Sequence, residues 1–201
     1  MHIFALFSYL KQVCNHPALA LKTDSDYNKY ECGKWELFKE LLEESLNSGA
    51  KVVVFTQYLG MIKIMEKYCE SIQTGYVSLT GATKNRGRII QKFAEDSSCR
   101  VFLGSLKAGG VGIDLVAASV VIHYDRWWNS AKEDQATDRV HRIGQTRGVQ
   151  VFKLITRKTI EERIASIIDR KKNLVKNALV EDSPDTLKVF SRKELLELLT
   201  M

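Results

Sequence analysis

The chain has 201 residues, 45% of them apolar, and its 30 Lys and Arg outnumber 24 Asp and Glu to give a net charge of +6. This length predicts one globular domain with a substantial core, and the charge is compatible with a polyanionic partner. No apolar run is long enough to span a bilayer, and the apolar start lacks a basic leader, so we expect neither a membrane segment nor a signal peptide.

Four cysteines are spread along the chain without a C-x-x-C pair, at Cys14, Cys32, Cys69 and Cys99. This spacing supports neither a zinc site nor a disulfide framework, and it favours free thiols in a reducing compartment. His16 lies two residues after Cys14, but two potential ligands without two more do not make a metal site. We therefore expect no structural metal.

The first elements are helical. Apolar residues at helical spacing predict a helix over residues 3–13, which ends at CNHP because Pro17 disfavours helical geometry at His16. The polar stretch 22–33 predicts a connecting loop, and a second amphipathic helix is predicted over 35–46. Because the chain opens within a helix and without a capping residue, we expect it to be part of a longer protein.

From residue 51 onward, short apolar runs alternate with helical patterns. Helices are predicted over 59–69 and 86–93, and continuous β-branched runs joined by helices indicate a parallel sheet covered on both faces. The fold class is therefore α/β. Strands are predicted at 52–55, 76–79, 100–104, 119–124 and 149–155.

The last part of the chain is predicted to be helical. Thr159 with Glu162 three residues later is typical of a helix start, and the helix continues to Val175. Its basic segment 170–176 is better explained as a solvated helix face than as a DNA contact. A short helix is predicted over 191–199. We divide the chain into an N-terminal helix and loop, a central lobe and a C-terminal helical extension, at residues 1–33, 34–158 and 159–201.

A glycine-rich segment, GSLKAGGVGIDL at 104–115, lies between two predicted strands. Gly109, Gly110 and Gly112 leave the backbone free to turn tightly and to point amides toward an anion. The segment is not a dinucleotide fingerprint, because the third glycine of that pattern would fall at Leu115. A tight turn without a ligand is the alternative.

Two arginines stand three residues apart in the segment 135–145, QATDRVHRIGQ. A capping signal at Ser130 precedes them, so Arg139 and Arg142 are expected on one face of a helix, with Gln135 one turn before Arg139. Arginine carries a planar fork of donors that fits phosphate. Taken alone, the segment could also be a solvated basic helix.

These motifs resemble, in the same order, those of the Swi/Snf family of helicase-like ATPases in superfamily 2. The resemblance covers nearly the whole chain. The DRWWN segment and the compact spacing of the motifs are similar to those of the bacterial and archaeal branch of the family, or of its close eukaryotic relatives. It implies the second of two RecA-like lobes that hold one ATP between them and move along duplex DNA. The matching segments are QVCNHPAL (12–19), VVVFTQY (52–58), LTGATKNR (79–86), GSLKAGGVGIDL (104–115), HYDRWWNS (123–130), QATDRVHRIGQ (135–145) and LITRKTIEERI (154–164).

The resemblance assigns residues to the nucleotide. It implies that Arg142 is the arginine finger, that Arg139 contacts the γ-phosphate, and that Gln135 couples the nucleotide site to the DNA site. Asp138 is expected to orient an arginine. On the ribose side the resemblance implies cofactor-binding residues Gly110, Gly112 and Asp114, although the family more often has Asn at the last of these positions.

A second group is implied to contact the DNA backbone, since short hydroxyl donors and flexible turns after strands suit phosphate contacts. Trp128 resembles a tryptophan of the family that touches this backbone, and a buried aromatic is the alternative for both Trp128 and Trp127. The complete group is Gln57, Thr80, Gly81, Thr83, Ser105, Lys107 and Trp128.

The sequence contains neither G-x-x-x-x-G-K-[ST] nor an Asp-Glu pair followed by x-His, which would hold the ATP phosphates and magnesium. We therefore expect half of an ATP hydrolase, inactive alone, whose ATP and Mg²⁺ are held mainly by a preceding RecA-like lobe. Its expected partners are double-stranded DNA and that lobe. The expected location is the cytoplasm with its nucleoid in a bacterium or archaeon, or the nucleus in a eukaryote.

Two other functions are compatible with the residues. The first is a non-catalytic nucleic-acid or protein interaction module with the same fold, which would lose nothing when Arg142 is changed to Ala. The second is an RNA helicase lobe. It is disfavoured because the HRIGQ and RWWN segments resemble the Swi/Snf branch.

Overall fold

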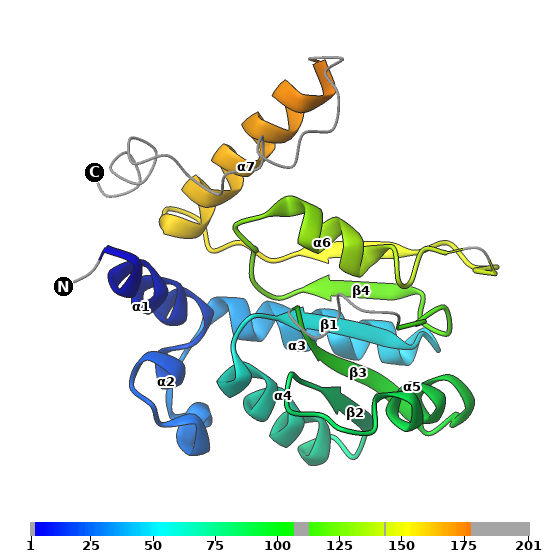
Figure 1. Ribbon diagram of the computed structural model, residues 1–201. Helices are drawn as coiled ribbons and strands as arrows, with labels where there is room; N and C mark the ends of the chain where they lie inside the picture. Colours follow the sequence, from blue (N-terminus) through cyan, green and yellow to red (C-terminus); the bar gives the residue numbers. More distant parts are fainter. Residues whose placement is uncertain (1–2, 107–112, 143, 178–201) are drawn as a thin grey trace.

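The computed structural model describes residues 3–106, 113–142 and 144–177. Its centre is a five-stranded, all-parallel sheet in the order β2-β3-β1-β4-β5 (Figure 1). All five strands predicted from the apolar runs are confirmed. Their bounds are β1 (Val52–Thr56), β2 (Gly75–Leu79), β3 (Cys99–Ser105), β4 (Val120–His123) and β5 (Gln150–Lys153).

Alternate residues of the central strand face opposite layers. Val52 and Val54 belong to one apolar cluster and Val53 and Phe55 to the other, and all four are fully buried. This two-sided burial is the reason that the strand reads as an uninterrupted apolar run. The register places Phe55 and Leu79 both opposite Gly104, so the carboxyl ends of β1, β2 and β3 lie at one level.

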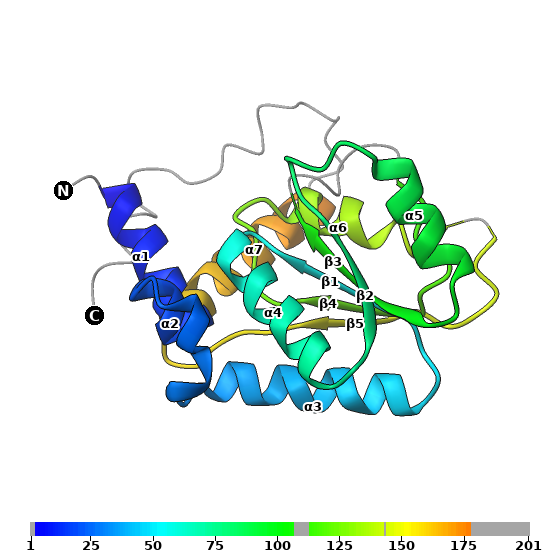
Figure 2. The ribbon, with the colours of Figure 1, turned by 90° about the horizontal axis from the view of Figure 1, so that it is seen from below.

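Helices cover both faces of the sheet, and Figure 2 shows the strands between α3 and α6. On one face lie α3 (Gly33–Asn47) and α4 (Leu59–Ser71), whose aromatic and aliphatic side chains form the larger cluster. On the other face lie α5 (Arg86–Glu95) and the short α6 (Ser130–Thr137). The predicted RecA-like arrangement, a parallel sheet flanked by helices, is confirmed.

The helical additions meet at one side of the lobe. Helix α1 (Ile3–Asn15) and helix α7 (Ile160–Asn177) share an apolar cluster in which Phe7 packs with Ile164 and Ile168 (Figure 1). Between α1 and α3, the stretch predicted as a loop contains η1, a 3-10 helix (Asp24–Lys29). The helix predicted over 191–199 lies outside the described residues.

The caps of two helices explain where the chain turns. His16 ends the run from α1 and caps α2 (Pro17–Ala20), because its Nδ1 accepts a hydrogen bond of 3.2 Å from Ala18 N. At α7, the Thr159 hydroxyl accepts from Glu161 N at 3.2 Å and the Glu162 carboxylate accepts from Lys158 N at 2.9 Å. The predicted start of the C-terminal helix is thereby confirmed. None of the helices in the described ranges is long and apolar enough to cross a membrane.

A buried histidine makes stability dependent on pH. His123 stacks on Phe55 with ring centroids 5.6 Å apart, and its Nε2 lies 2.9 Å from Thr137 Oγ1. Burial lowers the pKa of His123 from the usual 6.5 to about 4, so the folded protein keeps the ring neutral where the unfolded chain is protonated. The free energy of unfolding is therefore unaffected by this ring above pH 6.5, and it decreases as the pH falls from 6.5 to 4, because protons then bind preferentially to the unfolded chain.

Lowering the pH from 7 to 4.5 is expected to cost about 2 to 3 kcal/mol of unfolding free energy through His123, at about 1.4 kcal/mol per pKa unit. Urea unfolding across this range, for the protein and for His123→Gln, measures that share as the difference between the two pH profiles. Parallel profiles would show that the imidazole does not resist protonation in the folded state.

Candidate nucleotide and nucleic-acid site

The two arginines lie on a tight turn after α6, formed by residues 139–142 and called the arginine turn below. Helix α6 ends at Thr137, and the backbone continues through turns in which Arg139 N donates to Ala136 O at 3.3 Å and Val140 N to Thr137 O at 2.9 Å. The expectation that Arg139 and Arg142 share one face of a helix is therefore wrong. The helix stops because Val140 is drawn into the apolar cluster beneath the turn and because the Arg139 carbonyl accepts from Leu115 N at 2.9 Å.

The start of α6 also differs from the expectation. Asn129, rather than Ser130, caps the helix, since its Oδ1 accepts from Ala131 N at 2.9 Å. Glu133, which resembles the second half of a capping box, is fully buried. Its carboxylate accepts from Arg126 Nε at 3.0 and 3.1 Å and from Trp127 N at 2.6 Å.

Neither guanidinium group has a hydrogen-bond or ion-pair partner among the described residues. Arg142 is exposed, and the structure gives it no ion pair with a described residue. Arg139 is half-buried, and its buried Nε has no hydrogen-bond partner among the described residues. The expected orienting role of Asp138 is not seen, because this exposed residue forms no ion pair with either arginine within the described ranges. An unpaired, partly buried guanidinium is poised for an anion.

The described end of the glycine-rich segment is joined to this turn by the bond from Leu115 N to the Arg139 carbonyl. Lys107, Gly110 and Gly112 lie outside the described residues. Asp114 is exposed at the end of that segment, and its Oδ1 accepts from Val116 N at 3.3 Å. Since Leu115 N donates to the Arg139 carbonyl, the structure places Asp114 beside the arginine turn, as a shared nucleotide site requires.

The residues expected at DNA follow neighbouring strands at one edge of the sheet. Ser105 ends β3 and is 5% exposed, while Thr80 and Thr83 form a small turn after β2. In that turn Thr80 N donates to Thr83 Oγ1 at 2.9 Å and Thr83 N donates to Thr80 O at 3.2 Å. Gly81, between them, is exposed.

Gln57 follows β1 at the same edge, but its amide donors point into the protein. Its Nε2 donates to Asp125 Oδ1 at 2.5 Å and to Arg126 O at 2.7 Å, which uses both hydrogens. Asp125 is fully buried and also accepts from Thr56 Oγ1 at 2.5 Å. This carboxylate, which the sequence did not single out, ties the end of β1 to the loop after β4.

Trp128 lies at the junction between the lobe and the helical additions. It is half-buried, packs edge-on against Phe7 with centroids 6.0 Å apart, and has Lys11 Nζ 5.0 Å from its ring centroid. Lys11 is itself buried and donates to Arg126 O at 2.7 Å. The expected alternative of an aromatic packing residue describes this environment, and a DNA contact by Trp128 stays a prediction.

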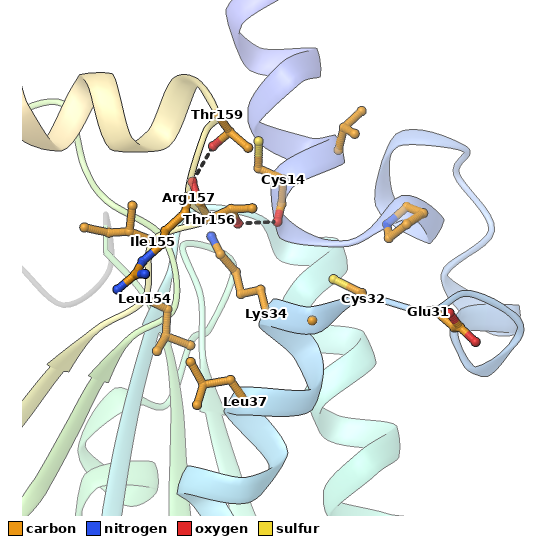
Figure 3. A pocket seen from close by; sticks show the side chains of 13 residues that line it. Cys14, Glu31, Cys32, Lys34, Leu37, Leu154, Ile155, Thr156, Arg157 and Thr159 are labelled. Atoms are coloured by element: carbon orange, nitrogen blue, oxygen red, sulfur yellow. Dashed lines mark hydrogen bonds between the residues drawn. The ribbon is translucent and has the colours of Figure 1, made fainter.

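A pocket of about 470 Å³ lies between α1, the start of α3 and the segment after β5 (Figure 3). Cys14 and Cys32 line it, and burial raises the pKa of both thiols, which disfavours the thiolate that binds metals. Within the part of the chain that the structure describes, no three His, Cys, Asp or Glu residues are grouped to hold a metal ion. Lys34, which also lines the pocket, forms an ion pair in which its Nζ lies 2.6 and 2.5 Å from the two carboxylate oxygens of Glu161.

Known proteins share this architecture and these motifs. Residues 33–144 match the family model described as the helicase conserved C-terminal domain. An uncharacterized ATP-dependent helicase of Mycoplasma genitalium is 43% identical over 98% of this chain and 19% of its own length. The helicase SWR1 of Saccharomyces cerevisiae is 35% identical over 88% of this chain and 12% of its own length.

Solved structures of related ATPase domains have the same fold as this chain. The SWI2/SNF2 ATPase core of Sulfolobus solfataricus in complex with double-stranded DNA superposes with a TM-score of 0.73 at 38% identity, covering 98% of this chain and 41% of that one. The C-terminal part of the Fun30 ATPase domain gives a TM-score of 0.71 at 32% identity, covering 96% and 60%.

The fold, the arginine turn and the match to the family model define a helicase C-terminal domain, the second RecA-like lobe of a superfamily 2 enzyme. Within that class, the chain belongs to the Swi/Snf family of ATPases. It spans about a fifth or less of the length of the two curated relatives above.

Proposed function

We propose that the chain is the C-terminal half of an ATP-dependent, double-stranded DNA translocase or remodeller. The observation that carries this proposal is the pinned arginine turn beside Asp114, with the Arg142 guanidinium exposed and the buried Arg139 Nε without a partner among the described residues. In the proposal Arg142 is the finger, Arg139 contacts the γ-phosphate and Gln135 links the nucleotide to DNA. Asp114, with Gly110 and Gly112, takes the ribose side.

The nucleotide would be shared with a preceding RecA-like lobe. A bound ATP supplies the phosphoryl group, and the family's need for Mg²⁺ would be met mainly by that lobe. The residues described here fit the remaining task, since the orphaned Nε of Arg139 and the exposed guanidinium of Arg142 are donors suited to phosphate oxygens. Stabilisation of charge in the transition state is the contribution expected of such donors.

DNA would be held through its phosphates. Thr80, Gly81 and Thr83 offer a hydroxyl-bearing turn at the same sheet edge as Ser105 and Gln57, and Lys107 and Trp128 complete the proposed contacts. The Sulfolobus solfataricus relative whose structure contains double-stranded DNA supports this assignment. Backbone contacts of this kind make binding sensitive to salt and nearly indifferent to sequence.

Organisation and location follow as proposals. Residues 34–158 would form the lobe, 1–33 a helical lead-in and 159–201 a helical extension. The protein would act in the bacterial or archaeal cytoplasm at the nucleoid, or in the nucleus of a eukaryote. Its partners would be duplex DNA and the N-terminal lobe of the same protein.

ATP hydrolysis by this chain alone and by the protein that carries both lobes, each with and without duplex DNA, tests the proposal. We expect no turnover from the chain alone, because it has no phosphate-binding loop, and DNA-stimulated turnover from both lobes. Turnover by the chain alone would sink the half-site proposal. Stimulation by single-stranded RNA instead of duplex DNA would favour an RNA helicase lobe.

A non-catalytic interaction module with this fold is the alternative. It is distinguished by DNA binding that does not change when the first lobe is present and by indifference to the loss of Arg142. The hydrogen bond from Leu115 N to the Arg139 carbonyl, which joins the arginine turn to the segment of Asp114, favours the catalytic assignment, because DNA binding alone does not require these two segments to meet.

A further inference from the structure

Both ends of the Gln145 side-chain amide are hydrogen-bonded to the protein backbone. Its side chain is half-buried, and its Oε1 accepts from Arg147 N at 2.9 Å. Its Nε2 faces three main-chain carbonyls. The acceptors are Ala118 O at 2.8 Å, Val116 O at 3.0 Å and Val140 O at 3.4 Å.

These carbonyls belong to two different segments. Two of them lie just after Asp114, in the turn that follows the glycine-rich segment, and the third lies within the arginine turn between Arg139 and Arg142. One amide therefore bridges the turn that follows Asp114 and the turn that carries Arg139 and Arg142.

Backbone hydrogen bonds hold the arginine turn at both ends, one from the segment after Asp114 and one within the local turn that leads to Gln145. The Arg139 carbonyl accepts from Leu115 N at 2.9 Å, and the Arg142 carbonyl accepts from Gln145 N at 3.0 Å. The arginine turn is thus fixed at its first and last residues, and the Gln145 side chain fixes its middle. The arginine side chains are left to project from a rigid backbone.

The carbonyls depend on this donor. Val140 and Ala118 are buried, at 0% and 1% exposure, so a carbonyl there that loses its donor is poorly placed to regain one from water. Relief would come from a shift of the turn relative to the segment after Asp114. A displacement of about 1 Å at groups that bind a reacting phosphate can cost about 100-fold in rate.

We infer that Gln145 is a positioning residue, which sets the arginine turn against the Asp114 segment without itself touching the nucleotide. The inference rests on the proposed function, since it assigns Gln145 to the same nucleotide site. The two residues have different roles in this inference. Gln145 fixes the backbone of the arginine turn, whereas Arg142 offers a charged group to the nucleotide.

The test uses the two-lobe protein and a double-substitution cycle. Gln145→Met keeps the length of the side chain and removes the donors, and Gln150→Met makes the same change at an exposed glutamine of β5. We expect Gln145→Met to lower kcat for ATP by about 10- to 100-fold while duplex DNA affinity matches the control. In an Arg142→Ala background, Gln145→Met should lower kcat less than about threefold further, because the two act on one interaction.

Other results decide against the inference. If Arg142→Ala slows turnover but Gln145→Met behaves like Gln150→Met, or if the two losses multiply, Gln145 has no positioning role while the proposed function stands. If neither Arg142→Ala nor Arg139→Ala slows turnover, the proposed function and the inference fall together. Should Gln145→Met fail to fold, Gln145→Asn, which withdraws the amide by one methylene, is taken through the same cycle with the same criteria.

Discussion

Arg142→Ala in the two-lobe protein is expected to lower kcat for DNA-stimulated ATP hydrolysis by about 10³- to 10⁵-fold, the range observed when an arginine finger is removed. At about 1.4 kcal/mol per decade this is roughly 4 to 7 kcal/mol of transition-state stabilisation, far above the value of a surface ion pair. Arg142 is exposed and free of described ion pairs, so its loss should leave folding intact. Single-turnover and steady-state assays at saturating DNA measure the effect.

Two further variants sharpen this experiment. Arg142→Lys keeps the charge and loses the planar fork, and we expect it to recover only part of the rate. Arg147→Ala removes an exposed positive charge five residues further along and should leave kcat nearly unchanged. A normal rate for Arg142→Ala combined with a severe loss for Arg139→Ala would move the finger to Arg139, and normal rates for both would remove the catalytic assignment.

The second large effect is expected on stability. Lys34 and Glu161 form an ion pair whose side chains are 3% and 0% exposed, and Glu161 Oε2 also accepts from Thr156 N at 2.9 Å. Glu161→Ala leaves the ammonium buried with Asn15 Oδ1, at 3.2 Å, as its remaining hydrogen-bond acceptor. We expect the free energy of unfolding to fall by about 3 to 5 kcal/mol, because an uncompensated buried charge is costly.

Urea unfolding, followed by circular dichroism, measures this loss. The surface pair Lys39 and Glu36, at 2.7 Å with side chains 29% and 56% exposed, is a matched control, and Glu36→Ala should cost less than about 1 kcal/mol. Replacing both buried partners, as in Lys34→Met with Glu161→Leu, should restore much of the stability. A loss from Glu161→Ala no larger than that of the control would mean that the pair does not hold α3 to α7.

The sheet could be predicted because its signal is local. The central strand and its neighbour β4 are continuous apolar runs, and the run 52–55 is buried on both faces, so this part of the pattern follows directly from the sequence. The arginine turn could not be predicted in the same way. The helix before it ends where Val140 enters the core and where Leu115 supplies a hydrogen bond from a distant segment. Neither contact can be recognised from the spacing of apolar residues near the turn.

The same limit applies to the buried polar residues. Asp125 and Glu133 look in the sequence like any surface carboxylate, yet each is fully buried and holds the partners that shape the site. Gln57 was expected to face DNA, while its amide donors are spent on Asp125 and Arg126. Motif order identified the family, and tertiary contacts decided which motif residues face outward.

The strand order has a consequence for how the chain is made. β1 is central, and its two neighbours, β3 and β4, both follow it in sequence. During synthesis at about 5 to 20 residues per second, the roughly 70 residues from the start of β1 to the end of β4 take about 4 to 14 s to emerge. Throughout that interval one edge of β1 lacks the strand that pairs with it, and α3 and α4, which pack on a face of the sheet, leave the backbone donors and acceptors of that edge uncovered until β4 is made.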